Sequence, residues 1–157
     1  AHMMVDNPDK HISAFINAGT DIITIHYEAC PSLDFTISSV KQYGVKMSLA
    51  INPNTDFSKI ENYLHLLDQV LVMTVHPGLP GQTFIEASAQ KIAIIRKSIQ
   101  EKQLTTELEV DGGINAHTAP IAAEAGASVL VAGSAIYDHP NGINNAIKLL
   151  REKINSL

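Results

Sequence analysis

Disulfide frameworks and membrane spans are the first possibilities that the sequence excludes. It contains one cysteine and no tryptophan, and aromatic residues make up only 5% of the chain. The lone Cys30 cannot form an internal disulfide and fits a reducing compartment, which we expect to be the cytoplasm. No apolar run approaches the ~18 residues of a membrane helix, and no stretch resembles a signal peptide. We therefore expect no membrane partner.

Positive charge is also scarce. Eleven Lys and Arg stand against 16 Asp and Glu, which gives a formal net charge of −5. Because the cations form no basic run, nucleic acid is not an expected partner. The composition, with 45% apolar and 17% charged residues, is that of a globular protein. No linker or low-complexity tract divides the chain, so we treat 1–157 as a single domain.

Near-continuous apolar runs recur along the chain and are typical of buried parallel strands. They read DIITIHYEA from residue 21, VKMSLAINP from 45, QVLVMTVHP from 69, LEVDGG from 108 and SVLVAGS from 128. Helical patterns lie between them, at 8–19, 32–44, 56–68, 83–103 and 116–126. Asn7, Thr55 and Asn115 are the expected helix caps. This alternation predicts parallel strands joined by right-handed crossovers.

Two folds contain such an alternation: an open doubly wound sheet and the (β/α)8 barrel, or TIM barrel. A full barrel usually takes ~250 residues. Five strands, with a further short strand at HMMV (2–5), are too few to close one. We expect an N-terminally truncated portion of a barrel, comprising about strands 3–8.

Three strand ends share an unusual composition. The segments 77–82, 111–115 and 132–136 combine glycine with small or polar residues and contain no Lys or Arg. Ligands of parallel α/β folds bind at this edge of the sheet. Glycine lets backbone amides approach an anion closely, so a phosphate there would be held by amides, the Ser134 hydroxyl and helix dipoles. The alternative is that the glycines only make tight turns.

Asp111 gives the sharper signal. A carboxylate at the end of a buried strand costs free energy unless a metal, a hydrogen bond or catalysis uses it. Helix capping is the alternative, but Asn115 already fills that place. Three histidines, His2, His26 and His76, lie at or near strand ends. We expect structural roles for the last two, and solvent exposure for His11, His65, His117 and His139.

Together, VMTVHPGLPGQ, EVDGGIN and VAGSAIY closely resemble ribulose-phosphate 3-epimerase, a (β/α)8 enzyme family of the pentose phosphate pathway. HMMVDNP, AGTDIITIHYEA and LAINPNT fit the same family in the same order. The resemblance covers essentially the whole chain but only the later two thirds or so of the family's length. It implies a TIM barrel of the ribulose-phosphate-binding type.

The resemblance also implies a mechanism and a site. Members of the family interconvert ribulose 5-phosphate and xylulose 5-phosphate through an enediolate, with two aspartates that exchange the C3 proton from opposite faces. Both aspartates, with two histidines, hold a divalent metal (Zn, Fe, Mn or Co). Asp111 matches a catalytic and metal-binding aspartate, and His2 a metal-binding histidine. Met4 and Met73 match methionines of the enediolate pocket. The matched substrate and phosphate contacts are His2, Gly78, Leu79, Pro80, Gly81, Gly112, Gly113, Gly133 and Ser134.

Departures from the family pattern leave alternatives open. The family usually has PGFGGQ where this chain has PGLPGQ, so Leu79 replaces an aromatic residue and Pro80 lacks an N–H. Residues 1–3 also resemble a cloning remnant, in which case His2 matches by accident. One proton-transfer group is absent, so we expect the segment alone to be inactive. Five or six strands leave two open sheet edges, so we expect it to associate, most simply as a homo-oligomer.

Three other functions compete with the epimerase. The first is an allulose 6-phosphate 3-epimerase-like enzyme, and the second is a non-catalytic, phosphate-binding barrel fragment. The third is a phosphate-barrel decarboxylase or synthase. These enzymes usually need a lysine at a strand end, and no strand end here carries one.

Overall fold

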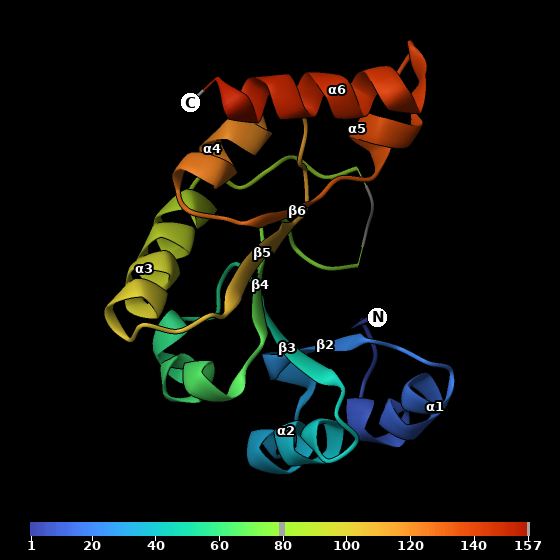
Figure 1. Ribbon diagram of the computed structural model, residues 1–157, viewed down its shortest axis with the longest axis vertical. Helices are drawn as coiled ribbons and strands as arrows, with labels where there is room; N and C mark the ends of the chain where they lie inside the picture. Colours follow the sequence, from blue (N-terminus) through green and yellow to red (C-terminus); the bar gives the residue numbers. More distant parts are fainter. Residues whose placement is uncertain (79–80, 157) are drawn as a thin grey trace.

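The computed structural model describes residues 1–78 and 81–156, and it contains a sheet of six parallel strands with helices along its outer side (Figure 1). The strands are β1 (His2–Met3), β2 (Ile22–His26), β3 (Lys46–Ile51), β4 (Gln69–Met73), β5 (Glu107–Asp111) and β6 (Val129–Val131). All five predicted strands and the short strand at the N-terminus are therefore present.

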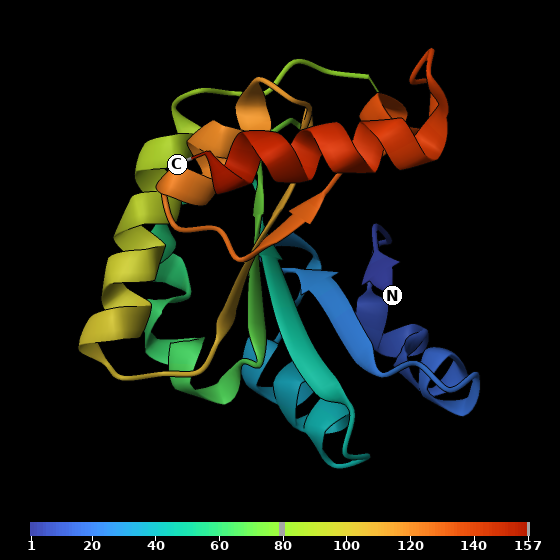
Figure 2. The same cartoon turned by 45° about the horizontal axis from the view of Figure 1, so that its top comes forward.

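The strand order decides between the two folds that the sequence left open. Each strand pairs with its neighbour in the chain, in the order β1-β2-β3-β4-β5-β6. A doubly wound sheet reverses its strand order part of the way along, whereas a barrel does not. The structure is thus a portion of a (β/α)8 barrel. Figure 2 shows the curl of the sheet, which leaves a concave inner side between the N-terminus and β6.

The helices differ from the predicted segments in several places. The α-helices are α1 (Ile12–Asn17), α2 (Leu33–Lys41), α3 (Ser88–Glu101), α4 (Thr118–Glu124), α5 (Ser134–Tyr137) and α6 (Gly142–Asn155), and the 3₁₀ helices are η1 (Pro8–Lys10), η2 (Tyr27–Ala29), η3 (Phe57–Lys59) and η4 (Glu61–Leu66). The predicted helix at 56–68 is therefore two 3₁₀ helices. The one predicted at 83–103 begins only at Ser88.

The expected caps explain part of this difference. The Asn7 side chain makes no capping hydrogen bond, and a 3₁₀ turn follows it in place of the first α-helical turn. Asp56, not Thr55, caps η3 by accepting from the Ser58 N–H. Asn115 does act as expected, because its side-chain oxygen accepts from the N–H groups of His117 and Thr118 at 2.8 and 3.2 Å.

Successive side chains of each strand point to opposite faces of the sheet. The outer face carries fully buried aliphatic residues, among them Ile23, Leu49, Val72 and Val110, which form the main core beneath the helices. The inner face is more polar: one row in register across the sheet consists of His2, Thr24, Ser48, Gln69 and Glu107. In the described chain, no helix is long and apolar enough to cross a membrane.

Candidate functional site

An open pocket of about 880 Å³ lies at the carboxyl ends of β4, β5 and β6. All three glycine-rich stretches contribute to its wall, through residues 76–78 and 81–84 after β4, 111–115 at the end of β5 and 133–135 after β6. Ligands bind at this edge of parallel α/β folds. The strand ends that the sequence singles out therefore do face a common space.

Most of the predicted site residues lie in this wall. They are Met4, Met73, Gly78, Gly81, Asp111, Gly112, Gly113, Gly133 and Ser134. Met4 is 54% exposed, whereas Met73 is only 2% exposed and packs with Ala50, Leu71 and Val75 on the inner face. Leu79 and Pro80 lie outside the described residues. His76 and His117 are exposed, and they too belong to the pocket wall.

The glycines of the wall serve different purposes. Gly112 and Gly113 have φ angles of 127° and 64°, and a Cβ on Gly113 would lie 2.4 Å from the Phe84 backbone nitrogen. These two glycines are needed by the fold itself, since a side chain would be strained and would collide. Gly133 has φ −100° and nothing within 4 Å of an added Cβ. Its missing side chain leaves room in the pocket and is not required by local packing.

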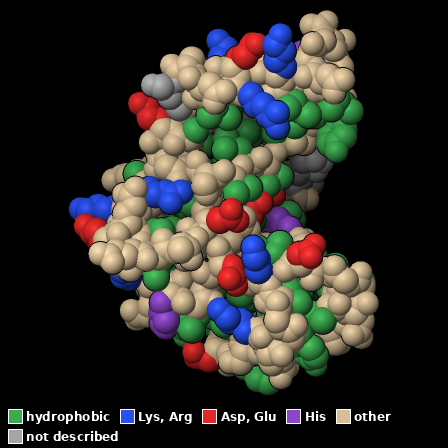
Figure 3. Space-filling model, in the orientation of Figure 1, with side chains coloured by type: hydrophobic (Ala, Val, Ile, Leu, Met, Phe, Trp, Pro, Cys, Tyr) green, Lys and Arg blue, Asp and Glu red, His purple; other side chains and the backbone are tan. Residues whose placement is uncertain are grey.

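Asp111 faces His2 across the inner side of the curled sheet. Asp111 ends β5 and is in register with Met73 and Val131, while His2 belongs to edge strand β1. Three strands separate β1 from β5 in the sheet, yet His2 Nδ1 lies 3.4 Å from Asp111 Oδ2. Both side chains are about one quarter exposed, at 22% and 24%. In Figure 3, acidic and histidine side chains lie in the middle region of this face, with Lys or Arg side chains beside them.

A second group of polar residues lies behind His2. His26 is buried at 7% exposure, and its Nε2 lies 2.8 Å from His2 Nε2. Its Nδ1 faces Glu28 Oε2 at 3.7 Å. Burial by itself raises the pKa of the Glu28 carboxyl, but the nearby His26 ring and hydrogen bonds from Thr55 and the Asn52 N–H outweigh it and lower the pKa to about 2. His26 is thus buried between His2 and Glu28, and Glu28 was missed by the sequence reasoning.

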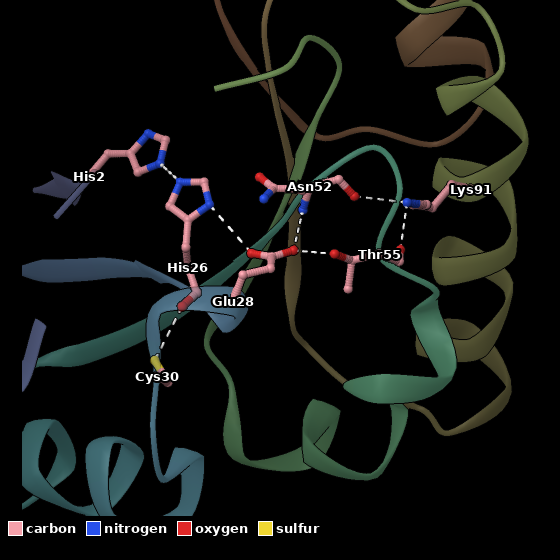
Figure 4. Close-up of polar contacts among 7 residues, drawn as sticks. All are labelled: His2, His26, Glu28, Cys30, Asn52, Thr55 and Lys91. Atoms are coloured by element: carbon pink, nitrogen blue, oxygen red, sulfur yellow. Dashed lines mark hydrogen bonds and ion pairs between the residues drawn. The ribbon is translucent and has the colours of Figure 1, made fainter. Parts of the chain in front are cut away.

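Lys91 of α3 holds the loop that carries these partners of Glu28. Its Nζ donates to the backbone oxygens of Asn52 and Thr55 at 3.0 and 2.6 Å (Figure 4). It also donates to the Pro53 backbone oxygen at 2.6 Å. Burial lowers the pKa of Lys91, and the negative charges of Asp56 and Glu28 oppose this. The ammonium group contacts backbone oxygens of this loop, so it does not supply the pocket with a lysine.

Three acidic residues, Glu107, Glu109 and Asp111, alternate along β5 and so share its inner face. Burial raises the pKa of Glu109, the nearby His2 opposes the rise, and the negative charges of Asp111 and Glu107 add to it. Burial also raises the pKa of the Cys30 thiol to about 11. Cys30 Sγ donates to the His26 carbonyl at 3.2 Å, so the thiol is a structural contact of the β2 end.

The strand order and the pocket define the chain as part of a (β/α)8 barrel whose candidate site lies at the carboxyl ends of its strands. A 3-hexulose-6-phosphate synthase of Salmonella typhimurium superposes with a TM-score of 0.66 at 18% identity, covering 96% of this chain and 69% of that one. An orotidine 5'-phosphate decarboxylase of Pyrococcus horikoshii gives 0.67 at 18% identity, covering 100% and 74%. Identities this low establish the fold alone.

The chain belongs to the ribulose-phosphate 3-epimerase family, whose profile matches residues 1–137. The ribulose-phosphate 3-epimerase of Bacillus subtilis is 47% identical over 137 residues, which are 87% of this chain and 63% of that protein. The Arabidopsis thaliana chloroplastic relative is 41% identical over 87% of this chain and 49% of its own length. The Escherichia coli K12 relative is 40% identical over 89% and 62%. The family resemblance is confirmed, and the chain spans from 49% to 63% of the length of these relatives.

Proposed function

We propose that the chain forms part of an enzyme that inverts C3 of a ketose phosphate, converting ribulose 5-phosphate to xylulose 5-phosphate. The observation that carries the proposal is the pairing of Asp111 with His2 beside a pocket walled largely by glycine backbone. A carboxylate placed there can exchange a proton with a bound sugar. Identities of 40–47% to ribulose-phosphate 3-epimerases support this choice of substrate.

Asp111 is the proton-transfer group of the scheme. Its carboxylate takes the C3 proton, and the electron pair of the C–H bond moves into the C2 carbonyl to give an enediolate. Inversion requires a second acid at the opposite face, because a single group returns the proton to the face it came from. Asp111 is the one acidic side chain among the described residues that line the pocket. We assign the second acid to strands outside residues 1–157.

The His2–Asp111 pair fits half of a divalent metal site. Imidazole and carboxylate are ligands suited to Zn, Fe, Mn or Co, and their Nδ1 and Oδ2 atoms face each other at 3.4 Å. Across residues 1–78 and 81–156, no group of three or more His, Cys, Asp or Glu side chains is placed to hold a metal. The remaining ligands would come from the strands that supply the second acid. When bound, a divalent cation supplies electrostatic stabilisation for the enediolate oxygens.

The phosphate is assigned to the loop between β6 and α5. The first helical hydrogen bond there runs from the Ile136 N–H to the Gly133 carbonyl at 2.9 Å. The N–H groups of Gly133, Ser134 and Ala135 precede this bond, and groups in that position have no partner within the helix. They and the Ser134 hydroxyl suit an anion, and residues 133–135 belong to the pocket wall.

A phosphate-binding half-barrel without turnover is the second candidate, and the single acid in the described pocket favours it. The test is to complete residues 1–157 with the N-terminal strands of the Bacillus subtilis relative and to assay ribulose 5-phosphate in D2O with Zn²⁺, Fe²⁺, Mn²⁺ or Co²⁺. Asp111→Asn should reduce epimerisation by about 10²- to 10⁴-fold, and the exposed Asp138→Asn should not. Deuterium exchange at C3 reports Asp111 separately from inversion. Near-normal exchange in Asp111→Asn would remove Asp111 from the mechanism.

The compartment and the assembly belong to the same proposal. A single thiol held as a structural contact suits the reducing cytoplasm. The edge strands β1 and β6 each have one side without a pairing strand in the described sheet. Unpaired edges favour association, so we propose that the chain functions in a homo-oligomer or with strands that close the barrel.

A further inference from the structure

A line of polar contacts connects Asp111 to the outer helix layer. It runs from Asp111 to His2, from His2 to His26 and from His26 to Glu28, with separations of 3.4, 2.8 and 3.7 Å. The two imidazole rings are stacked, with centroids 5.0 Å apart and planes inclined by 16°. Figure 4 shows how the rings and the Glu28 carboxylate follow one another from β1 towards the loop beside α3.

This line has one contact more than it has protons. A neutral imidazole carries one N–H and one lone pair, whereas an ionised carboxylate only accepts. Two neutral rings therefore bring two protons to three contacts, namely those of Glu28 with His26, of His26 with His2 and of His2 with Asp111. One of the three must be left with two electron pairs facing each other. A cation suits that place, because it attracts both electron pairs.

The surroundings of Glu28 favour a proton at its contact with His26. Glu28 Oε1 accepts from the Asn52 N–H at 2.9 Å and from the Thr55 hydroxyl. Lys91 in turn holds the loop that bears both donors. The carboxylate is thus fixed as an acceptor, with Oε2 directed at His26 Nδ1.

The tautomers of both rings follow from that acceptor. A proton on His26 Nδ1 leaves His26 Nε2 with a lone pair. His2 must then donate from Nε2, and its Nδ1 is left bare opposite Asp111. Outer partners commonly set the tautomer of metal-binding histidines in this way.

We propose that Glu28 and His26 are positioning residues, which set the tautomer of His2 so that its Nδ1 lone pair is directed with Asp111 at a divalent cation. The inference rests on the proposed function and adds two residues to it. Replacing Glu28 by glutamine tests it closely, because the shape is kept. The glutamine oxygen can still accept from Asn52 and Thr55, which turns an NH2 group towards His26. That donor should reverse both tautomers and place a proton on His2 Nδ1.

The measurement is the ¹⁵N–¹H ring spectrum of the metal-free chain at about pH 8.5, two units above the ordinary histidine pKa of about 6.5. In the parent chain we expect His26 protonated at Nδ1 and His2 at Nε2. Glu28→Gln should exchange both positions, whereas Glu28→Asp should keep them, because aspartate is also an acceptor. Glu152→Gln on α6 makes the same chemical change at an exposed glutamate and should alter neither ring. In a Zn²⁺ titration followed by calorimetry, both parent and variant are first completed with the N-terminal strands of the Bacillus subtilis relative. Glu28→Gln should then bind Zn²⁺ about 10- to 100-fold more weakly than the parent.

The outcomes separate this inference from the proposed function. A parent chain with the proton on His2 Nδ1 would overturn the inference, and this spectrum decides even if Glu28→Gln does not fold. Unchanged tautomers and Zn²⁺ affinity in a folded Glu28→Gln would also overturn it. The expected tautomers without Zn²⁺ binding by the completed parent protein would uphold the positioning role and count against the metal pair of the proposed function.

Discussion

Adding one methyl group at Gly133 should weaken phosphate binding and leave the fold intact, whereas the same change at Gly113 should damage the fold. The Gly133 backbone has φ −100°, and an added Cβ meets nothing within 4 Å. Gly133→Ala should therefore change the free energy of unfolding by less than about 0.5 kcal/mol. Its methyl group occupies the pocket wall and blocks one backbone donor. Losing a hydrogen bond to a charged group costs about 1.5–3 kcal/mol, or roughly 10- to 100-fold in affinity.

Gly113 is the matched comparison. A residue with a side chain costs about 1–2 kcal/mol in a left-handed conformation, and Gly113 has φ 64°. Its Cβ would also lie 2.4 and 2.8 Å from the Phe84 nitrogen and Cα, which are backbone atoms that cannot rotate away. Overpacking of this kind adds about 1–3 kcal/mol, so Gly113→Ala should lower the free energy of unfolding by about 2–5 kcal/mol.

Two assays separate the effects. Urea unfolding followed by far-ultraviolet circular dichroism suits a chain with no tryptophan, and calorimetry measures the binding of ribulose 5-phosphate and of inorganic phosphate. Parent-like phosphate affinity in Gly133→Ala would refute the phosphate site after β6. Parent-like stability in Gly113→Ala would refute the argument from the Phe84 contact.

Three further predictions follow from the polar network and the sheet edges. Lys91→Met should lower the free energy of unfolding by about 1–3 kcal/mol, because three backbone carbonyls lose a charged donor. The control, Lys97→Met at an exposed position, should change it by less than about 0.5 kcal/mol. Equal effects of the two substitutions in urea unfolding would count against the role of Lys91. The pKa of Glu28 is lowered from 4.5 to about 2 in the folded chain, so its contribution to stability is fully present above about pH 4.5 and is lost as the pH falls towards 2. Glu28→Gln should flatten that part of the stability profile, and an unchanged slope would contradict the pKa assignment. The chain alone should be larger than a monomer by light scattering and should not epimerise ribulose 5-phosphate; a monomer with robust turnover would refute both the barrel portion and the two-acid mechanism.

The sheet could be predicted from the sequence because its signals are local. Each apolar run contains the information for its own strand, and the recurrence of runs and helical patterns predicts parallel pairing. The family motifs likewise contribute to the pocket wall, through residues 76–78, 81–82, 111–115, 131 and 133–135. The 3₁₀ helices at 57–66 were not predicted, because the apolar pattern there is equally compatible with an α-helix. Thr55 was expected to cap that helix, but its hydroxyl is committed to Glu28.

The network behind His2 could not be predicted, because its contacts join residues far apart in the sequence. His2 and His26 are 24 residues apart, and Glu28 and Thr55 are 27 apart. Lys91 lies 36 to 39 residues from its three acceptors. No spacing rule connects such positions. The one available signal was Glu28 itself, an acidic residue two positions after a histidine at a strand end.

Every strand of this sheet is hydrogen-bonded to the strand that precedes or follows it in the sequence. Pairing between neighbours can form one unit at a time, without waiting for distant parts of the chain to meet. Because each strand pairs only with its sequence neighbours, a strand and its following helix can be added or lost at either end. The register between the remaining strands then stays the same, as in repeat proteins. Closure of the barrel is the step that differs, because it must join the first strand to the last. Assembly of the six units is therefore a local process, and closure is a separate, non-local event that depends on what reaches β1 and β6.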